Sequence, residues 1–156
     1  MNIYSLLSKD TVVAGLNVEN KEELLNSLVD LLKGQVEESQ LESIRNAVFE
    51  REEIMSTGVG KGLAIPHGKS SDISESYASF AILDEPVEFG SIDDQLVDLV
   101  FLLVGPESKN SVHIKLLSRI SRLLNSSSFR NKLSGSQTGE EILACFEKEE
   151  MQYFKS

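Results

Sequence analysis

The stretch LVDLVFLLVG, residues 96–105, is apolar at almost every position. A strand with one face in water alternates apolar and polar side chains, whereas a strand buried on both faces is a nearly continuous apolar run. This run therefore predicts a central strand covered by helices on both sides. A second strand-like stretch, SYASFAIL, begins at Ser76, and Pro86 and Gly90 between the two predict turns.

Helix signals lie on both sides of this strand pair. Residues 110–124, NSVHIKLLSRISRLL, predict an amphipathic helix with Ile114 and Leu117 on its apolar face. Shorter strands are predicted over TVVAGL from Thr11 and over residues 63–65. Alternating helices and strands predict an α/β layered sandwich, with the sheet between helical layers. Three polar pairs have the spacing of helix N-caps, namely Asn20 with Glu23, Ser39 with Glu42, and Thr138 with Glu141.

Length and composition are those of one globular domain, which we expect to span residues 1–156. Hydrophobic residues make up 40% of the chain and charged residues 26%. The longest apolar run is too short to cross a bilayer, and the first ten residues lack the features of a leader, so we expect a cytoplasmic protein without membrane insertion. One cysteine, Cys145, excludes an internal disulfide, and two histidines disfavour a zinc site.

The charge balance disfavours a nucleic-acid partner. Asp and Glu number 25 against 15 Lys and Arg, which gives a formal net charge of -10. Affinity for nucleic acids comes mostly from basic side chains that neutralise phosphates, and an anionic membrane surface attracts basic segments for the same reason. A partner protein with a basic docking face is instead attracted to this chain.

The stretch GLAIPHGKS, residues 62–70, superficially resembles a phosphate-cradling P-loop. The P-loop spacing requires a glycine at position 63, where Leu63 stands, and Gly62 lies one residue too early. Pro66 removes one backbone donor, and the residues after Lys69 lack the apolar period of the helix that a P-loop opens. A nucleotide-binding protein is therefore a disfavoured alternative, and Lys69 is interpreted as a docking charge.

The same stretch can also be interpreted around its histidine. Pro66 restricts the preceding residue to extended geometry and Gly68 lets the chain turn away, so His67 is presented at a strand end, or else points into water as an ordinary turn residue. His113 lies on the apolar face at the start of its predicted helix, where it either bonds a carbonyl as a buried histidine or faces an anion at the helix N-terminus. Together with Arg51, the two histidines can surround one phosphoryl group.

Three segments together resemble enzyme IIA of the bacterial phosphoenolpyruvate-dependent phosphotransferase system, of the fructose/mannitol type that includes the nitrogen-regulatory branch. The resemblance spans essentially the whole chain, and the combination of its motifs is more specific than any one of them. It implies a mixed β-sheet of about five strands, flanked by helices on both faces. The three segments are REEIMSTGVGKGLAIPHGK from Arg51, PVEFGSIDDQLVDLVFLLVGPE from Pro86 and HIKLLSRISRLL from His113.

The resemblance also implies a role for each site residue. His67 is the phosphorylated residue, which receives its phosphoryl group on Nε2 from the histidine-containing phosphocarrier HPr. His113 supports the phosphoryl group, Arg51 neutralises its charge, and Ser56 and Thr57 are further phosphate ligands. The family chemistry implies no cofactor and no metal ion.

Two downstream partners stay open at this point. In a sugar-specific branch the phosphoryl group passes from His67 to a cysteine of an enzyme IIB, whereas in the nitrogen-regulatory branch the phosphorylation state controls binding to target proteins. No enzyme IIB segment follows in these 156 residues, so we expect a standalone module in which Cys145 serves packing. Relatives often carry an acidic residue before the second histidine, where this chain has Val112.

Overall fold

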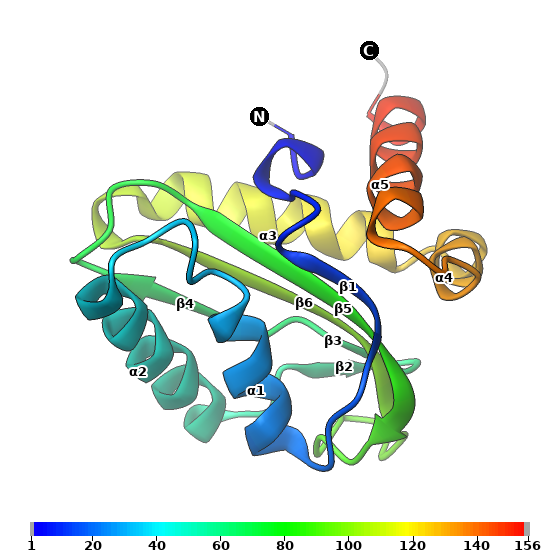
Figure 1. The fold of residues 1–156 in the computed structure, drawn as a ribbon, viewed down its shortest axis with the longest axis horizontal. Coiled ribbons are helices and arrows are strands. Elements are labelled where there is room, and N and C mark those ends of the chain that lie inside the picture. Colours follow the sequence, from blue (N-terminus) through cyan, green and yellow to red (C-terminus); the bar gives the residue numbers. More distant parts are fainter. Residues whose placement is uncertain (1, 155–156) are drawn as a thin grey trace.

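In the computed structural model, which describes residues 2–154, the apolar stretch forms β6 (Val97–Pro106), the central strand of a six-stranded sheet (Figure 1). The strand order is β1-β5-β6-β3-β2, and β4 also pairs with β6. The remaining strands are β1 (Val12–Leu16), β2 (Gly58–Gly60), β3 (Leu63–Ala64), β4 (His67–Ser70) and β5 (Tyr77–Val87).

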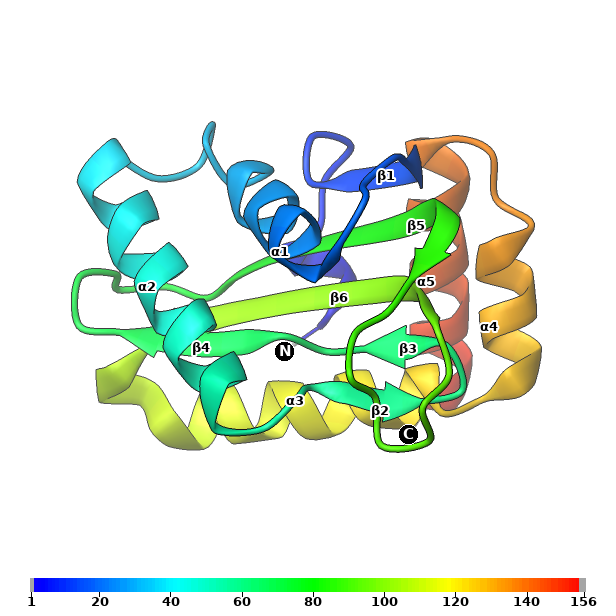
Figure 2. The same ribbon diagram turned by 90° about the horizontal axis from the view of Figure 1, so that it is seen from below.

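The sheet is mixed, as predicted. β5 runs antiparallel to β6, whereas β3 and β4 run parallel to it on its other side (Figure 2). Leu63 pairs with Leu99 and His67 pairs with Leu103, so the two short strands share one register along β6. Pro66 between them has no N–H to donate, which interrupts the ladder and divides one strand into two. The strand expected at residues 63–65 therefore exists, and it resumes at His67.

Helices cover both faces of the sheet (Figures 1 and 2). One layer consists of α1 (Lys21–Asp30) and α2 (Glu38–Ile54), and the other of α3 (Asn110–Leu124), α4 (Ser127–Ser134) and α5 (Gly139–Tyr153). Two single turns of 3₁₀ helix complete the elements, η1 (Tyr4–Leu6) and η2 (Glu107–Lys109).

Side chains of β6 enter both layers alternately. Val100, Leu102 and Val104 pack in the core under α1 and α2. Leu99, Phe101 and Leu103 pack in the core under α3, α4 and α5. Each fully buried side chain of this kind contributes about 1.5–3 kcal/mol relative to an exposed one. The continuous apolar run is thus explained by a strand with no solvated face.

Two of the three predicted N-caps are confirmed. Asn20 Oδ1 accepts from Glu23 N at 2.8 Å, and Thr138 Oγ1 accepts from Glu141 N at 3.1 Å. The cap predicted at Ser39 was wrong, because α2 begins at Glu38 and Glu37 is its N-cap residue. The second member of the actual pair is Gln40, whose Oε1 accepts from Glu37 N at 2.8 Å.

Several local expectations were corrected by tertiary packing. Ile114 is 57% exposed, and Leu116 is buried in its place. Pro86 lies inside β5 near a register irregularity, so no turn occurs there, and Gly90, with a φ of 75°, shortly precedes a turn at residues 92–93. Helix α4 was not predicted, because it has few apolar residues; burial of Phe129 against Phe146, at 5.3 Å between ring centroids, holds it in place.

Candidate active site

His67 opens β4, at the point where the strand resumes after Pro66. Its Nδ1 lies 2.9 Å from the backbone oxygen of Ile65. Since a carbonyl oxygen only accepts hydrogen bonds, this contact places the ring proton of neutral His67 on Nδ1. The other ring nitrogen, Nε2, then carries the free lone pair and is the nucleophilic atom of the side chain.

Gly68 lets α2 pack directly on β4. A Cβ added at this residue would lie 3.1 Å from the backbone carbon of Ala47 and 3.1 Å from the backbone nitrogen of Val48. Such contacts are tighter than ordinary van der Waals distances, so any side chain here would push the helix away. The close approach brings the last turn of α2, with Arg51, beside His67.

His113 lies next to His67 in the interior. The two ring centroids are 6.1 Å apart, and His113 is 3% exposed. Neither ring nitrogen of His113 has a hydrogen-bond partner among the described residues. Burial, and then the charges of His67 and Lys69, lower the pKa of His113 to about 4, so the ring is neutral and holds one unused N–H donor. Gly105 makes room for it, because an added Cβ would lie 2.9 Å from His113 Nδ1.

A hollow of about 520 Å³ opens beside His67. Arg51, Ser56 and Thr57 line it together with His67, so the structure brings four of the five expected site residues to one cavity. The fifth, His113, is not among the lining residues, and its ring centroid lies 6.1 Å from that of His67. Arg51 reaches the rim, where its Nη1 donates to the backbone oxygen of Met55 at 2.8 Å.

The surroundings keep His67 neutral. Burial lowers its pKa first, and the positive charges of Arg51 and Lys69 act in the same direction. The hydrogen bond to Ile65 and the negative charge of Glu52 raise the pKa, but the net shift is downward from 6.5. A neutral imidazole with a free Nε2 is a competent nucleophile at pH 7.

The hydroxyl groups of Ser56 and Thr57 already donate hydrogen bonds within the protein. Ser56 Oγ donates to the backbone oxygen of Phe89 at 3.0 Å and accepts from Gly58 N at 3.1 Å. Thr57 Oγ1 donates to Glu52 Oε2 at 2.6 Å. To donate to a phosphoryl oxygen, either hydroxyl must first leave its present acceptor.

Glu52 and Lys21 form an ion pair near the site that was not predicted from the sequence. Glu52 is 8% exposed, and its carboxylate lies 2.9 Å from Lys21 Nζ. The position of Glu52 in the sequence did indicate an ion pair, because a carboxylate in the last turn of a helix opposes the helix dipole and requires a compensating partner. Nothing in the sequence identified that partner as the first residue of α1.

The chain around Lys69 does not have the geometry of a P-loop. Residues 67–70 form a strand, whereas the P-loop lysine opens a helix. Lys69 Nζ lies 2.6 Å from Oδ1 of Asn110, the first residue of α3. The lysine thus bridges β4 and α3 close to the two histidines.

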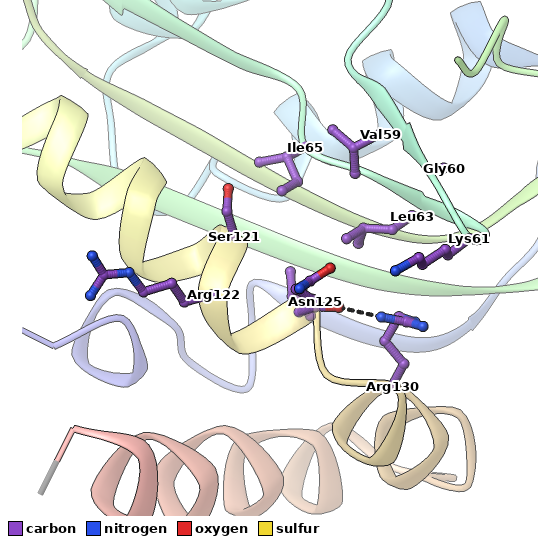
Figure 3. Close-up of a pocket in the computed structure, with 10 residues that line it drawn as sticks. Val59, Gly60, Lys61, Leu63, Ile65, Ser121, Arg122, Asn125 and Arg130 are labelled. Carbon is purple, nitrogen blue, oxygen red and sulfur yellow. Dashed lines mark hydrogen bonds between the residues drawn. The ribbon is translucent and has the colours of Figure 1, made fainter. Parts of the chain in front are cut away.

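A second hollow, of about 390 Å³, adjoins the first and shares Val59, Ile65 and Ser121 with it (Figure 3). Two of its cationic side chains, those of Arg122 and Arg130, lie at the C-terminal end of α3. Arg130 Nη1 donates to the oxygen of Leu124, the last residue of α3, and Arg122 lies in the last turn of the same helix. No histidine is among the residues that line it, so the hollow beside His67 is the candidate site.

No helix within residues 2–154 combines the length and the apolar character needed to cross a membrane.

Comparison with known families gives a match over most of the chain. The family model described as "Phosphoenolpyruvate-dependent sugar phosphotransferase system, EIIA 2" matches residues 5–149. A nitrogen regulatory protein of Bradyrhizobium diazoefficiens is 38% identical over 145 residues, which cover 91% of this chain and 92% of that protein. The PTS system fructose-specific EIIABC component of Bacillus subtilis is 30% identical over 143 residues, which cover 92% of this chain and 22% of that protein.

A solved structure shows the same fold. The crystal structure of the nitrogen regulatory protein IIA-Ntr from Neisseria meningitidis superposes with a TM-score of 0.84 at 29% identity. The match covers 92% of this chain and 98% of that one. The mixed sheet between two helical layers is therefore shared along nearly the full length of both chains.

Proposed function

Because this chain belongs to the EIIA type 2 family of the phosphoenolpyruvate-dependent sugar phosphotransferase system, we propose that Nε2 of His67 is the atom that accepts and returns its phosphoryl group. Family members are phosphotransferases that carry a phosphohistidine. The observation that carries the assignment is the 2.9 Å contact between His67 Nδ1 and Ile65 O, which leaves Nε2 as the free nucleophile beside a hollow lined by Arg51.

The reaction exchanges one phosphorus–nitrogen bond for another. The lone pair of His67 Nε2 attacks phosphorus, the bond to the donor histidine breaks, and the donor ring keeps the bonding electrons. His67 becomes a phosphorylated imidazolium whose Nδ1–H still donates to Ile65 O. This hydrogen bond stabilises the positive charge that develops on the ring.

The negative charge on the phosphoryl oxygens must be stabilised by hydrogen-bond donors around the hollow. Arg51 has five N–H groups, and the one contact to Met55 O leaves the others available for those oxygens. His113 offers its unused N–H without adding a positive charge, because its pKa of about 4 keeps the ring neutral at pH 7. Ser56 and Thr57 are secondary ligands in this proposal, available only after a change of hydrogen-bond acceptor.

The rim of the hollow fits a protein donor of the HPr type. Met55, Val59 and Ile92 line the hollow and are 70%, 51% and 85% exposed. Apolar side chains gathered at a site in this way favour contact with another protein. The net charge of -10 favours a basic docking face on that donor. Phosphoenolpyruvate, the origin of the phosphoryl group, is an intracellular metabolite, which favours a cytoplasmic location.

Two acceptors are compatible with this chemistry. In sugar uptake the acceptor is a cysteine of an enzyme IIB, and the EIIABC relative from Bacillus subtilis combines A, B and C components by name. In the regulatory alternative, phosphorylation of His67 controls binding to target proteins. The higher identity to a nitrogen regulatory protein, 38% against 30%, supports that alternative.

Phosphoryl transfer from phosphoenolpyruvate through enzyme I and HPr tests the proposal directly. We expect one acid-labile phosphoryl group per chain, and no labelling of His67→Ala. Full labelling of that variant would refute the assignment of the site. Addition of a fructose-specific enzyme IIB then separates the two acceptors, because rapid loss of label to the IIB cysteine supports sugar uptake and retention of label supports the regulatory alternative.

A further inference from the structure

We infer that Glu52 and Lys21 are positioning residues for phosphoryl transfer, which hold residues 56–58 in the wall of the hollow beside His67. The inference rests on the proposed function of His67. Neither side chain lines the hollow, so both act through the segment that does.

Glu52 fixes Thr57 at two points. Its Oε1 accepts from Thr57 N at 2.8 Å and its Oε2 accepts from Thr57 Oγ1 at 2.6 Å. Both interactions are buried, and hydrogen bonds to a charged group are the strong ones. The carboxylate therefore sets the direction of the backbone as well as the side chain of Thr57.

Lys21 joins this contact to Phe89, the neighbour of Gly90, which lines the hollow. Its Nζ lies 2.9 Å from Glu52 Oε1 and donates to Phe89 O at 3.0 Å, and it sits 4.3 Å from the centroid of the Phe89 ring. The same Phe89 oxygen accepts from Ser56 Oγ. Lys21 thus connects Phe89 to the C-terminal turn of α2, with residues 56–58 between them.

The charges of the pair also suit a phosphoryl site. A buried carboxylate without a cation would repel the anionic phosphoryl group, whereas Lys21 neutralises Glu52. Stability alone gives no reason for an ion pair here, since a buried pair is often no more stabilising than apolar residues of the same size. The directed contacts of Glu52 to Thr57 and of Lys21 to Phe89 do give a reason for an ion pair at this place.

The chain contains a matched control. Arg45 and Asp30 form another ion pair between α2 and α1, with Arg45 Nη2 2.5 Å from Asp30 Oδ1. Neither residue lines the hollow beside His67. Removal of this pair by D30N/R45M loosens the same two helices without touching residues 56–58.

Single-turnover transfer from phosphorylated HPr measures the effect. We expect E52Q and K21M to slow labelling of His67 about tenfold or more, because small displacements of site groups cost up to about a hundredfold. The final level should stay at one phosphoryl group per chain, which a partly unfolded variant would not reach. T57V loses only the Oγ1 contact to Glu52 and should also slow labelling, and T57S should regain most of the rate. E52Q/T57V should be no slower than its slower parent, since both changes act on the same pair of residues.

A charge-sensitive measurement separates positioning from general packing. The charged or titratable groups facing His67 are Arg51 and Glu52 on α2, Lys69 on β4 and His113 on α3. Because Glu52 raises the pKa of His67, E52Q should lower that pKa further in an NMR titration, whereas D30N/R45M should leave both the pKa and the transfer rate unchanged.

Each outcome decides the question. If E52Q and K21M are both labelled as fast as the wild type, the positioning role is overturned. The proposed function still stands in that case, because the wild-type protein itself is labelled. Absence of wild-type labelling would overturn both. If D30N/R45M slowed labelling as much as E52Q and K21M do, looser packing of α1 on α2 would explain the slowing, and the positioning role would be overturned. If E52Q does not fold, K21M, whose side chain is 30% exposed, and T57V decide in its place.

Discussion

The rings of His67 and His113 lie 6.1 Å apart at an angle of 52°, and only His67 has a ring nitrogen in a hydrogen bond. His67 is bonded through Nδ1 to Ile65 O, whereas His113 is buried with both nitrogens free. A buried donor without a protein partner is costly, which leaves the His113 N–H available to a group bound at the site. The phosphoryl group on His67 is the partner we propose.

Removal of the His113 donor should slow transfer and leave some labelling. In His113→Ala the phosphoryl oxygens lose one aligned N–H, and the loss of one such donor costs about a hundredfold in related sites. Quench-flow measurement of labelling by phosphorylated HPr gives the rate. An unchanged rate would show that His113 serves only the core.

Replacement of Arg51 should change both the rate of phosphoryl transfer and the pKa of His67. In Arg51→Met the phosphoryl charge loses its main cation, and we expect transfer to fall by about a hundredfold or more. Because Arg51 lowers the pKa of His67, the same variant should raise that pKa, as followed by NMR. Arg122→Met, which lies at the neighbouring hollow, is the control and should change neither quantity.

Stability should fall between pH 6.5 and about 4. The folded-state pKa of His113 is about 4, below its ordinary 6.5, so the unfolded chain binds the proton first as the pH falls. The contribution of the neutral His113 ring to the free energy of unfolding is fully present above pH 6.5. About 2 kcal/mol of this contribution is lost between pH 7 and pH 5. Urea unfolding at the two pH values measures this loss.

His113→Gln supplies the control for that measurement, because glutamine does not titrate. Its loss of stability from pH 7 to pH 5 should be smaller than that of the wild type by about 2 kcal/mol. Identical pH dependence in the two proteins would contradict a depressed pKa at His113.

A methyl group at position 68 should separate β4 from α2. In Gly68→Ala the new Cβ meets the α2 backbone at 3.1 Å, so we expect a loss of about 1–3 kcal/mol and slower labelling of His67. Gly34→Ala is the matched control, since a Cβ there meets nothing within 4 Å. Equal stability of the two variants in urea unfolding would argue against close packing at Gly68.

Much of this arrangement could be predicted from local pattern. The apolar run at residues 96–105 predicted a strand buried on both faces, because only helices on both sides of a sheet remove all of its side chains from water. Residues 110–124 had the period of a helix with His113 on its buried side, and the structure has that helix with the same bounds. Pro66 and Gly68 marked His67 as a histidine held by its backbone.

The parts that could not be predicted depend on contacts between distant segments. Ser39 has the local form of a helix cap, but Glu37 is the residue at the start of α2. Helix α4 has few apolar residues, and it forms because Phe129 is buried against α5. Thr57 has the type of a phosphate ligand, yet its hydroxyl proton goes to Glu52.

The sequence by itself determined the layered α/β fold, since an apolar run within a short stretch specifies a strand buried on both faces. It also predicted His67 as the nucleophile, through Pro66 and Gly68 around it and through the resemblance of the surrounding motifs to enzyme IIA. Only the tertiary structure decided how Arg51 and His113 lie around His67, and that Glu52 and Lys21 lie behind the wall of the site. His113, Arg51, Glu52 and Lys21 come from three helices. Their distances, and the lowered pKa values of the two histidines, arise from packing and burial that no local pattern specifies.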